Sequence, residues 1–233
     1  MKLLRSTLTL TIALALVTLV ASVSPAAAAP RVPQIAFCEG SLQSYLVSVG
    51  ESINVLTDQV DAQTWTTGVS GNADLTIMVE MAGYADQNNI GIYNTVEATP
   101  TLFQVFPGAA GPGWSAYLHF GGGNLLVTLL NNGVPQGTTS YTGVDPHKFG
   151  FYLQGPGGLF YSQDWRNGNK AQVLTYLGTG DNSGDKWVCF EDLPYQYPDC
   201  LTDFEDAVIL VQSLNPVPAH GTTWGALKAL YGR

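Results

Sequence analysis

The acidic side chains near the C-terminal end of the chain carry the clearest chemical signal. Eight of the 18 Asp and Glu residues lie between Asp181 and Asp206, with Lys186 as the single base among them. Carboxylate oxygens are the ligands that Ca²⁺ prefers in proteins, and so many carboxylates would otherwise repel one another. This pattern predicts a calcium site. The candidate ligands are Glu191, Asp192, Asp199, Asp203, Glu205 and Asp206, with Asp86 and Asn88 as secondary candidates.

The spacing excludes an EF-hand loop beginning at Asp181. Ser183 and Asp185 fit its third and fifth positions, but Lys186 stands where the turn requires glycine. The twelfth position is Asp192 rather than Glu. We therefore expect the site to join two acidic strand ends, residues 190–194 and 203–206.

A metal-free interpretation of the same cluster stays open. If Cys189 and Cys200 face each other in a regular hairpin, Lys186 lies opposite Asp203 and forms a cross-strand ion pair. Carboxylates beside turns also cap backbone N–H groups without a metal. We favour calcium, and we predict a Cys189–Cys200 disulfide, with buried thiols as the alternative.

Catalytic signatures are weak in this chain. His119, His147 and His220 lack metal-ligand spacing, and no nucleophile-elbow or phosphate-loop motif occurs. Glu191 and Asp203 are a pair of carboxylates of the kind that hydrolyses glycosidic bonds, but two acids in an acid-rich segment are weak support. We do not expect an enzyme.

Aromatic side chains offer a second kind of binding site. Tryptophan and tyrosine rings on one open face of a sandwich stack on sugar rings, whereas buried ones belong to the core. A carbohydrate-binding module is therefore the main alternative function. Its candidate residues are Trp114, Trp165, Tyr195 and Tyr197, with Trp65 considered beside them.

Short apolar runs separated by turn residues must position these groups. Alternation of apolar residues over 74–81 predicts a strand, and glycine- or proline-rich turns separate the runs that follow. Many short strands at this spacing predict an all-β, antiparallel sandwich of jelly-roll-like type. The further strands are predicted at 90–93, 101–106, 116–120, 125–130, 149–153, 159–162, 173–177, 187–190 and 207–211.

One short helix is expected before the strands. Leu42, Tyr45, Leu46 and Val49 follow the spacing of one helical face, with Ser41 as its predicted cap and Gly50 at its end.

The first 29 residues have the order of a secretory signal peptide. Lys2 and Arg5 precede an apolar run over 8–20, which is too short to span a membrane, and small residues follow at 26–29. Removing this leader leaves 7 of the 9 basic residues against 18 acidic ones, which disfavours nucleic acid and anionic lipid as partners. We expect a secreted or surface-held protein without a membrane span, consisting of a leader (1–29), a β-sandwich domain (30–214), and a linker with a C-terminal tail (215–233).

The acidic segment resembles a family of exported bacterial domains of unknown function. Its signature is Phe-Glu-Asp-Leu followed by Asp-(Phe/Tyr)-Asn-Asp and an apolar strand, which is similar to residues 190–194, 203–206 and 208–211 here. Such domains occur in secreted and surface proteins, sometimes beside adhesin modules and sometimes with PEP-CTERM sorting signals. Glu205 replaces the signature's Asn, and only residues 216–218 resemble the sorting element.

Together these patterns predict a non-catalytic, calcium-binding β-sandwich that serves adhesion, surface assembly or matrix formation. The expected partner is a cell-surface or matrix protein or a glycan.

Overall fold

The computed structural model describes residues 40–80, 82–194 and 202–217. The predicted leader, the tail beyond Val217, Asp199, Cys200, Tyr195 and Tyr197 lie outside the described residues. None of the helices in the described ranges is long and apolar enough to cross a membrane.

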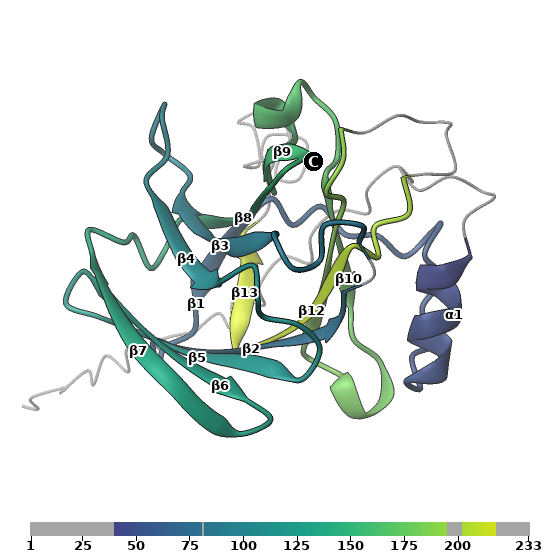
Figure 1. Ribbon diagram of the computed structural model, residues 1–233, viewed down its shortest axis with the longest axis horizontal. Helices are drawn as coiled ribbons and strands as arrows, with labels where there is room; N and C mark the ends of the chain where they lie inside the picture. The colour runs from purple at the N-terminus through teal and green to yellow at the C-terminus, as the bar shows by residue number, and fades with distance from the viewer. Residues whose placement is uncertain (1–39, 81, 195–201, 218–233) are drawn as a thin grey trace, which may run out of the picture.

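Two antiparallel sheets form the domain, as predicted (Figure 1). In the six-stranded sheet, β9 pairs with β8 beside the strand order β13-β1-β8-β3-β4. Its strands are β1 (Thr64–Thr67), β3 (Asn89–Asn94), β4 (Leu102–Phe106), β8 (Phe149–Gly155), β9 (Gly158–Tyr161) and β13 (Leu214–Val217).

The seven-stranded sheet has the order β10-β11-β12-β2-β5-β6-β7. Its strands are β2 (Asn72–Val79), β5 (Trp114–Gly121), β6 (Asn124–Asn131), β7 (Val134–Thr142), β10 (Val173–Leu177), β11 (Lys186–Phe190) and β12 (Ala207–Gln212). Two short 3-10 helices, η1 (Asp164–Asn167) and η2 (Gly180–Asn182), lie in the connections.

The main core lies between the sheets and follows from strand alternation. In β5, buried Ala116, Leu118 and Phe120 alternate with exposed Tyr117 and His119. Facing strands contribute aromatic rings to the same core, which β-branched and aromatic side chains fill efficiently.

A second core covers the outer face of β10, β11 and β12. There α1 (Ser41–Ser48) packs its buried Leu42 and Leu46 into a cluster with Trp187, Cys189 and Val208. Figure 1 shows α1 beside this end of the sheet. Because both faces of β11 are covered, all five of its residues are buried.

The predicted helix is confirmed, but its cap is different. Gly40 occupies the N-cap position, Ser41 is the first helical residue, and no side chain caps the helix. Gly50 follows the helix with a φ of 90°, which suits glycine.

Three strands were not predicted, namely β1, β7 and β13. β7 is almost wholly exposed, so its sequence carries no apolar alternation. β13 contains Pro216 and pairs with β1 at the edge of its sheet, a position that tolerates proline. The domain therefore extends through Val217, and 215–217 are not part of a linker.

Candidate metal centre

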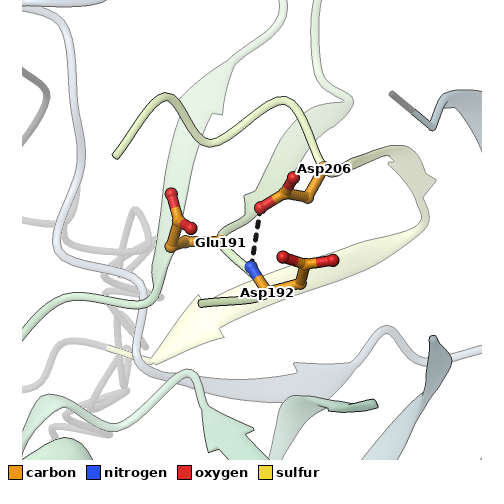
Figure 2. Close-up of side chains that lie close together, drawn as sticks. All are labelled: Glu191, Asp192 and Asp206. Carbon is orange, nitrogen blue, oxygen red and sulfur yellow. Dashed lines mark hydrogen bonds between the residues drawn. The ribbon is translucent and has the colours of Figure 1, made fainter. Parts of the chain in front are cut away.

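Three carboxylates converge where β11 ends and β12 begins. Phe190 pairs with Ala207, so Glu191 follows one strand and Asp206 precedes its neighbour at the same edge of the sheet. Asp192 comes next in the chain. One ligand oxygen from each of the three lies within 4.8 Å of the others, and Figure 2 shows their arrangement.

Backbone N–H groups hold these carboxylates in place. The Asp192 amide donates to Oδ2 of Asp206 at 2.7 Å, the contact drawn in Figure 2. Leu193 N donates to Oε1 of Glu191 and Asp203 N donates to Oε2 of the same carboxylate, each at 3.1 Å. Glu191 therefore connects the two acidic segments, as the metal-free alternative also predicts.

Burial makes the cluster electrostatically costly. Glu191 and Asp192 are each only 2% exposed. Burial raises the pKa of Glu191, and the negative charges of Asp206, Asp203 and Asp192 raise it further, despite the backbone donor at Leu193. The pKa of Asp206 is also raised, chiefly by burial. In the described part of the chain, no Lys or Arg contributes to the pKa shift of Glu191 or of Asp206. The negative charge of these carboxylates therefore has no basic partner there.

The opposite sheet contributes an amide to the same place. Asn88, directly before β3, is 1% exposed and donates from Nδ2 to Oδ2 of Asp192 at 2.8 Å. Its own Oδ1 is buried without a hydrogen-bond partner. A buried amide oxygen left unpaired costs free energy, and a cation would satisfy it.

The turn between β8 and β9 closes over this contact. A Cβ added to Gly155 would collide with Oδ1 of Asn88, and one added to Gly157 would collide with the carbonyl oxygen of Asp192. Only glycine allows the turn to approach this closely. The cluster therefore lies at the end of the sandwich where both sheets meet.

Glu80 is a member of this region that the sequence analysis missed. It follows β2, the neighbour of β12, and its Oε1 is buried without a hydrogen-bond partner. Burial, with Asp86 and Asp192 nearby, raises the pKa of Glu80 to about 8. The pairing of β2 with β12 brings it here, and that long-range pairing has no local sequence signal.

The remaining predicted ligands lie at varying distances from the cluster. Asn88 touches Asp192, and Asp86 is exposed but close enough to Glu80 to shift its pKa. Asp203 adds to the negative charge around Glu191, and its Oδ1 accepts a hydrogen bond from Glu205 N at 3.3 Å. Asp203 and Glu205 do not belong to the group of converging ligand oxygens.

The register predicted for the cysteine hairpin is wrong. Cys189 pairs with Val208 and Leu174, and Lys186 pairs with Val211 rather than facing Asp203. Cys189 is a free, buried thiol in this structure, packed into the second core. Cys200 lies outside the described residues, so the disulfide with Cys189 stays a prediction.

The tryptophans among the candidate sugar-binding residues, which are the candidates that the structure describes, do not share a face. Trp65 is fully buried, and Trp114 is partly buried against the main core from β5. Trp165 is 56% exposed on η1, which follows β9 of the other sheet. The guanidinium of Arg166 lies 4.2 Å from the Trp165 ring and 5.5 Å from that of Tyr161.

Two of the cavities formed by described residues lie elsewhere, and no carboxylate lines them. The larger, about 270 Å³, is lined by glycine-rich segments around Gly71, Gly122 and His147. The smaller, about 170 Å³, lies among Gln104, Val127 and Tyr141. Glu191 and Asp203 line neither cavity, so the glycosidase alternative gains no support from them.

No protein-family model matches the chain, and no curated protein matches it. The resemblance of the acidic motif to exported bacterial domains therefore stays a prediction. Among solved structures, an alginate lyase from Pseudomonas aeruginosa is similar at 11% identity with a TM-score of 0.14. The match covers 69% of this chain and 58% of that one, and so low a score carries no argument about fold or activity.

Proposed function

We propose that this protein is a non-catalytic, exported β-sandwich stabilised by Ca²⁺, serving adhesion, surface assembly or matrix formation. One observation carries the calcium assignment. Ligand oxygens of Glu191, Asp192 and Asp206 converge within 4.8 Å in a buried place, and the buried Asn88 contacts this group through Asp192. Buried carboxylates without a basic partner hold either protons or a cation, and a hard cation takes this set of oxygen ligands.

The position of the cluster supports a stabilising role. The carboxylates come from the seven-stranded sheet and Asn88 comes from the six-stranded one. A cation bound here would connect both sheets. Exported domains use calcium in this way because the ion is abundant outside the cell and binds only the folded state.

Calcium titration by isothermal calorimetry tests the assignment. The sample is the chain without its predicted leader, residues 30–233, after treatment with chelator. We expect binding by the wild type, with affinity reduced at least tenfold in Asp206→Asn and Glu191→Gln. Asp181→Asn is the matched control, because Asp181 is an exposed acid of the same segment outside the cluster. Wild-type protein that binds no calcium, or variants that bind as tightly as the control, would sink the assignment.

A carbohydrate-binding module is the second candidate function, and the exposure of Trp165 supports it. The Trp165 ring packs against the guanidinium of Arg166. This guanidinium donates hydrogen bonds to Gln163, Thr95 and Glu97, so it holds one side of the ring in place. An exposed, fixed indole is a platform for a sugar ring. Glycan-array binding that is lost in Trp165→Ala would support this function, and an array without signal would exclude it.

A further inference from the structure

We propose that this protein forms a two-fold symmetric dimer in which the β7 strands of two copies pair with each other, with Ser140 opposite Ser140. The pairing joins the two seven-stranded sheets into one continuous sheet. This inference goes beyond the proposed function, because it names a second copy of the chain as a partner. It is independent of the calcium site at β11 and β12, which β2, β5 and β6 separate from β7.

β7 is the open edge of the seven-stranded sheet. Its outer side pairs with no described strand, and every residue of β7 except Tyr141 is exposed. Figure 1 shows β7 as the outermost strand on its side of the sheet. The opposite edge is covered, because Tyr176 of β10 bridges to Gln59 and the Thr175 carbonyl accepts a hydrogen bond from Val60 N. An open edge presents unpaired N–H and C=O groups to another strand.

The direction of these backbone groups follows from the pairing of β7 with β6. Gly143, which directly follows β7, donates from N to the carbonyl of Gly123 at 2.9 Å, and the register is regular from there back to Thr138. Hydrogen-bonded and non-hydrogen-bonded pairs alternate along an antiparallel ladder. The N–H and C=O groups of Thr138, Ser140 and Thr142 therefore point away from β6.

These three outward-facing residues are self-complementary. In an antiparallel pair centred on Ser140, Thr138 of one copy lies opposite Thr142 of the other, so the order Thr, Ser, Thr is the same in both directions. Hydroxyl side chains then face each other across the new strand pair, which stabilises a sheet. Pro135 and the bulge beside it lie before Thr138, outside this pairing. A two-fold interface needs a patch that fits itself, and this edge meets that requirement.

The charge distribution favours a second copy as the occupant of the edge. The chain has a formal net charge of −9, so two copies repel each other wherever their acidic surfaces face. Residues 98–144 contain no Asp, Glu, Lys or Arg, and this stretch forms β4, β5, β6 and β7. Edge strands that avoid pairing often carry lysine or another charge, and β7 carries none. Two copies therefore meet along β7 without like charges facing each other.

Sedimentation velocity of residues 30–233 from about 1 µM to 1 mM tests the proposal. We expect the wild type to dimerise equally with Ca²⁺ and with chelator, so failure of the metal site leaves this result unchanged. Ser140→Pro removes an outward N–H and should be monomeric, whereas the control Ser140→Ala keeps the N–H and should dimerise like the wild type. A monomeric wild type, open-ended larger assemblies, or a dimer of Ser140→Pro would overturn the pairing.

A second variant keeps the test decisive if Ser140→Pro does not fold. Ser140→Lys places two lysines opposite each other at the two-fold axis, at an exposed position that does not disturb the monomer. We expect dimerisation about tenfold weaker at low salt, with recovery as salt screens the two charges. Leu126→Lys is the matched control, because exposed Leu126 pairs with Ser140 in the same copy and lies one strand further from the axis. Equal dimerisation of the two lysine variants would contradict the position of the axis.

Discussion

Asn88 before β3 donates a 2.8 Å hydrogen bond from Nδ2 to Oδ2 of Asp192 after β11, and this contact joins the two sheets of the sandwich at their shared end. Both residues are almost fully buried. Sequence separates them by 104 positions, so the contact forms only when the whole domain folds.

Removing this amide should destabilise the domain. We expect Asn88→Ala to lower the free energy of unfolding by about 1–3 kcal/mol, because the buried Asp192 carboxylate loses its donor. Chemical denaturation measures the change, and Gln87→Ala, an exposed neighbour, serves as the control. Equal stabilities of the two variants would contradict a structural role for Asn88.

Adding a methyl group to the turn between β8 and β9 should disturb the candidate metal site. In Gly157→Ala the new Cβ collides with the Asp192 carbonyl, so the turn or the acidic segment must move. We expect a loss of about 1–3 kcal/mol in unfolding free energy together with weaker calcium binding. Gly83→Ala is the matched control, because a Cβ there meets no atom within 4 Å. The same calcium affinity in both variants would contradict the claim that this turn supports the metal site.

The loss of folding stability at low pH should depend on Glu51. Burial alone would raise the pKa of this carboxyl, but hydrogen bonds from Thr179, Asn182 and Trp187 outweigh burial and lower it. A lowered pKa contributes stability that is present above the unfolded value and is lost as pH falls. We therefore expect Glu51→Gln to be less stable than the wild type at neutral pH by about 2 kcal/mol, with a smaller difference near pH 3.

Denaturation curves from pH 3 to 8, recorded with chelator, measure the Glu51 effect. A constant difference between wild type and Glu51→Gln across this range would contradict the lowered pKa.

The acidic cluster should give the opposite pH dependence when metal is absent. The pKa values of Glu191, Asp206 and Glu80 are raised in the folded state, chiefly by burial. The folded protein then keeps protons that the unfolded chain releases, so stability falls as pH rises above the unfolded values of these groups towards about 8. Calcium displaces the protons, so its stabilising effect should grow over the same range. A calcium effect that shrinks with rising pH would contradict this linkage.

Cys189 should behave as an inert thiol. It is fully buried, and burial raises its pKa, which suppresses the reactive thiolate. We expect alkylating reagents to modify it only after denaturation, as followed by mass spectrometry of the peptide that contains it. Protection of Cys189 in denatured, unreduced protein would instead indicate a disulfide.

Local patterns predicted much of the fold. The strand over residues 173–177 matches β10 at both ends, because its flanking turn residues mark its bounds. Glu191 and Asp206 come together because β11 and β12, which are consecutive in sequence, pair with each other. β7 was missed because a strand with both faces exposed needs no apolar alternation, and β13 because proline at a sheet edge resembles a linker.

Long-range pairing explains what sequence did not predict at the site. Glu80 lies at the same end of the sheet as the cluster only because β12 pairs with β2, and Asn88 touches Asp192 only because the second sheet packs on the first. The cysteine hairpin was wrong for a related reason. β11 pairs with β12 in a register that places Cys189 opposite Val208, and local sequence does not fix that register.

Thermal unfolding of residues 30–233 with millimolar Ca²⁺ and again with chelator tests the calcium-stabilised sandwich most directly. At a calcium concentration about 100-fold above the dissociation constant, binding to the folded state adds about 2.7 kcal/mol, which corresponds to a rise in Tm of roughly 5–10 °C. We predict this rise in the wild type and in Asp181→Asn, and its loss in Asp206→Asn. The same Tm with calcium and with chelator in the wild type would contradict the calcium site and favour carboxylates that only cap the backbone.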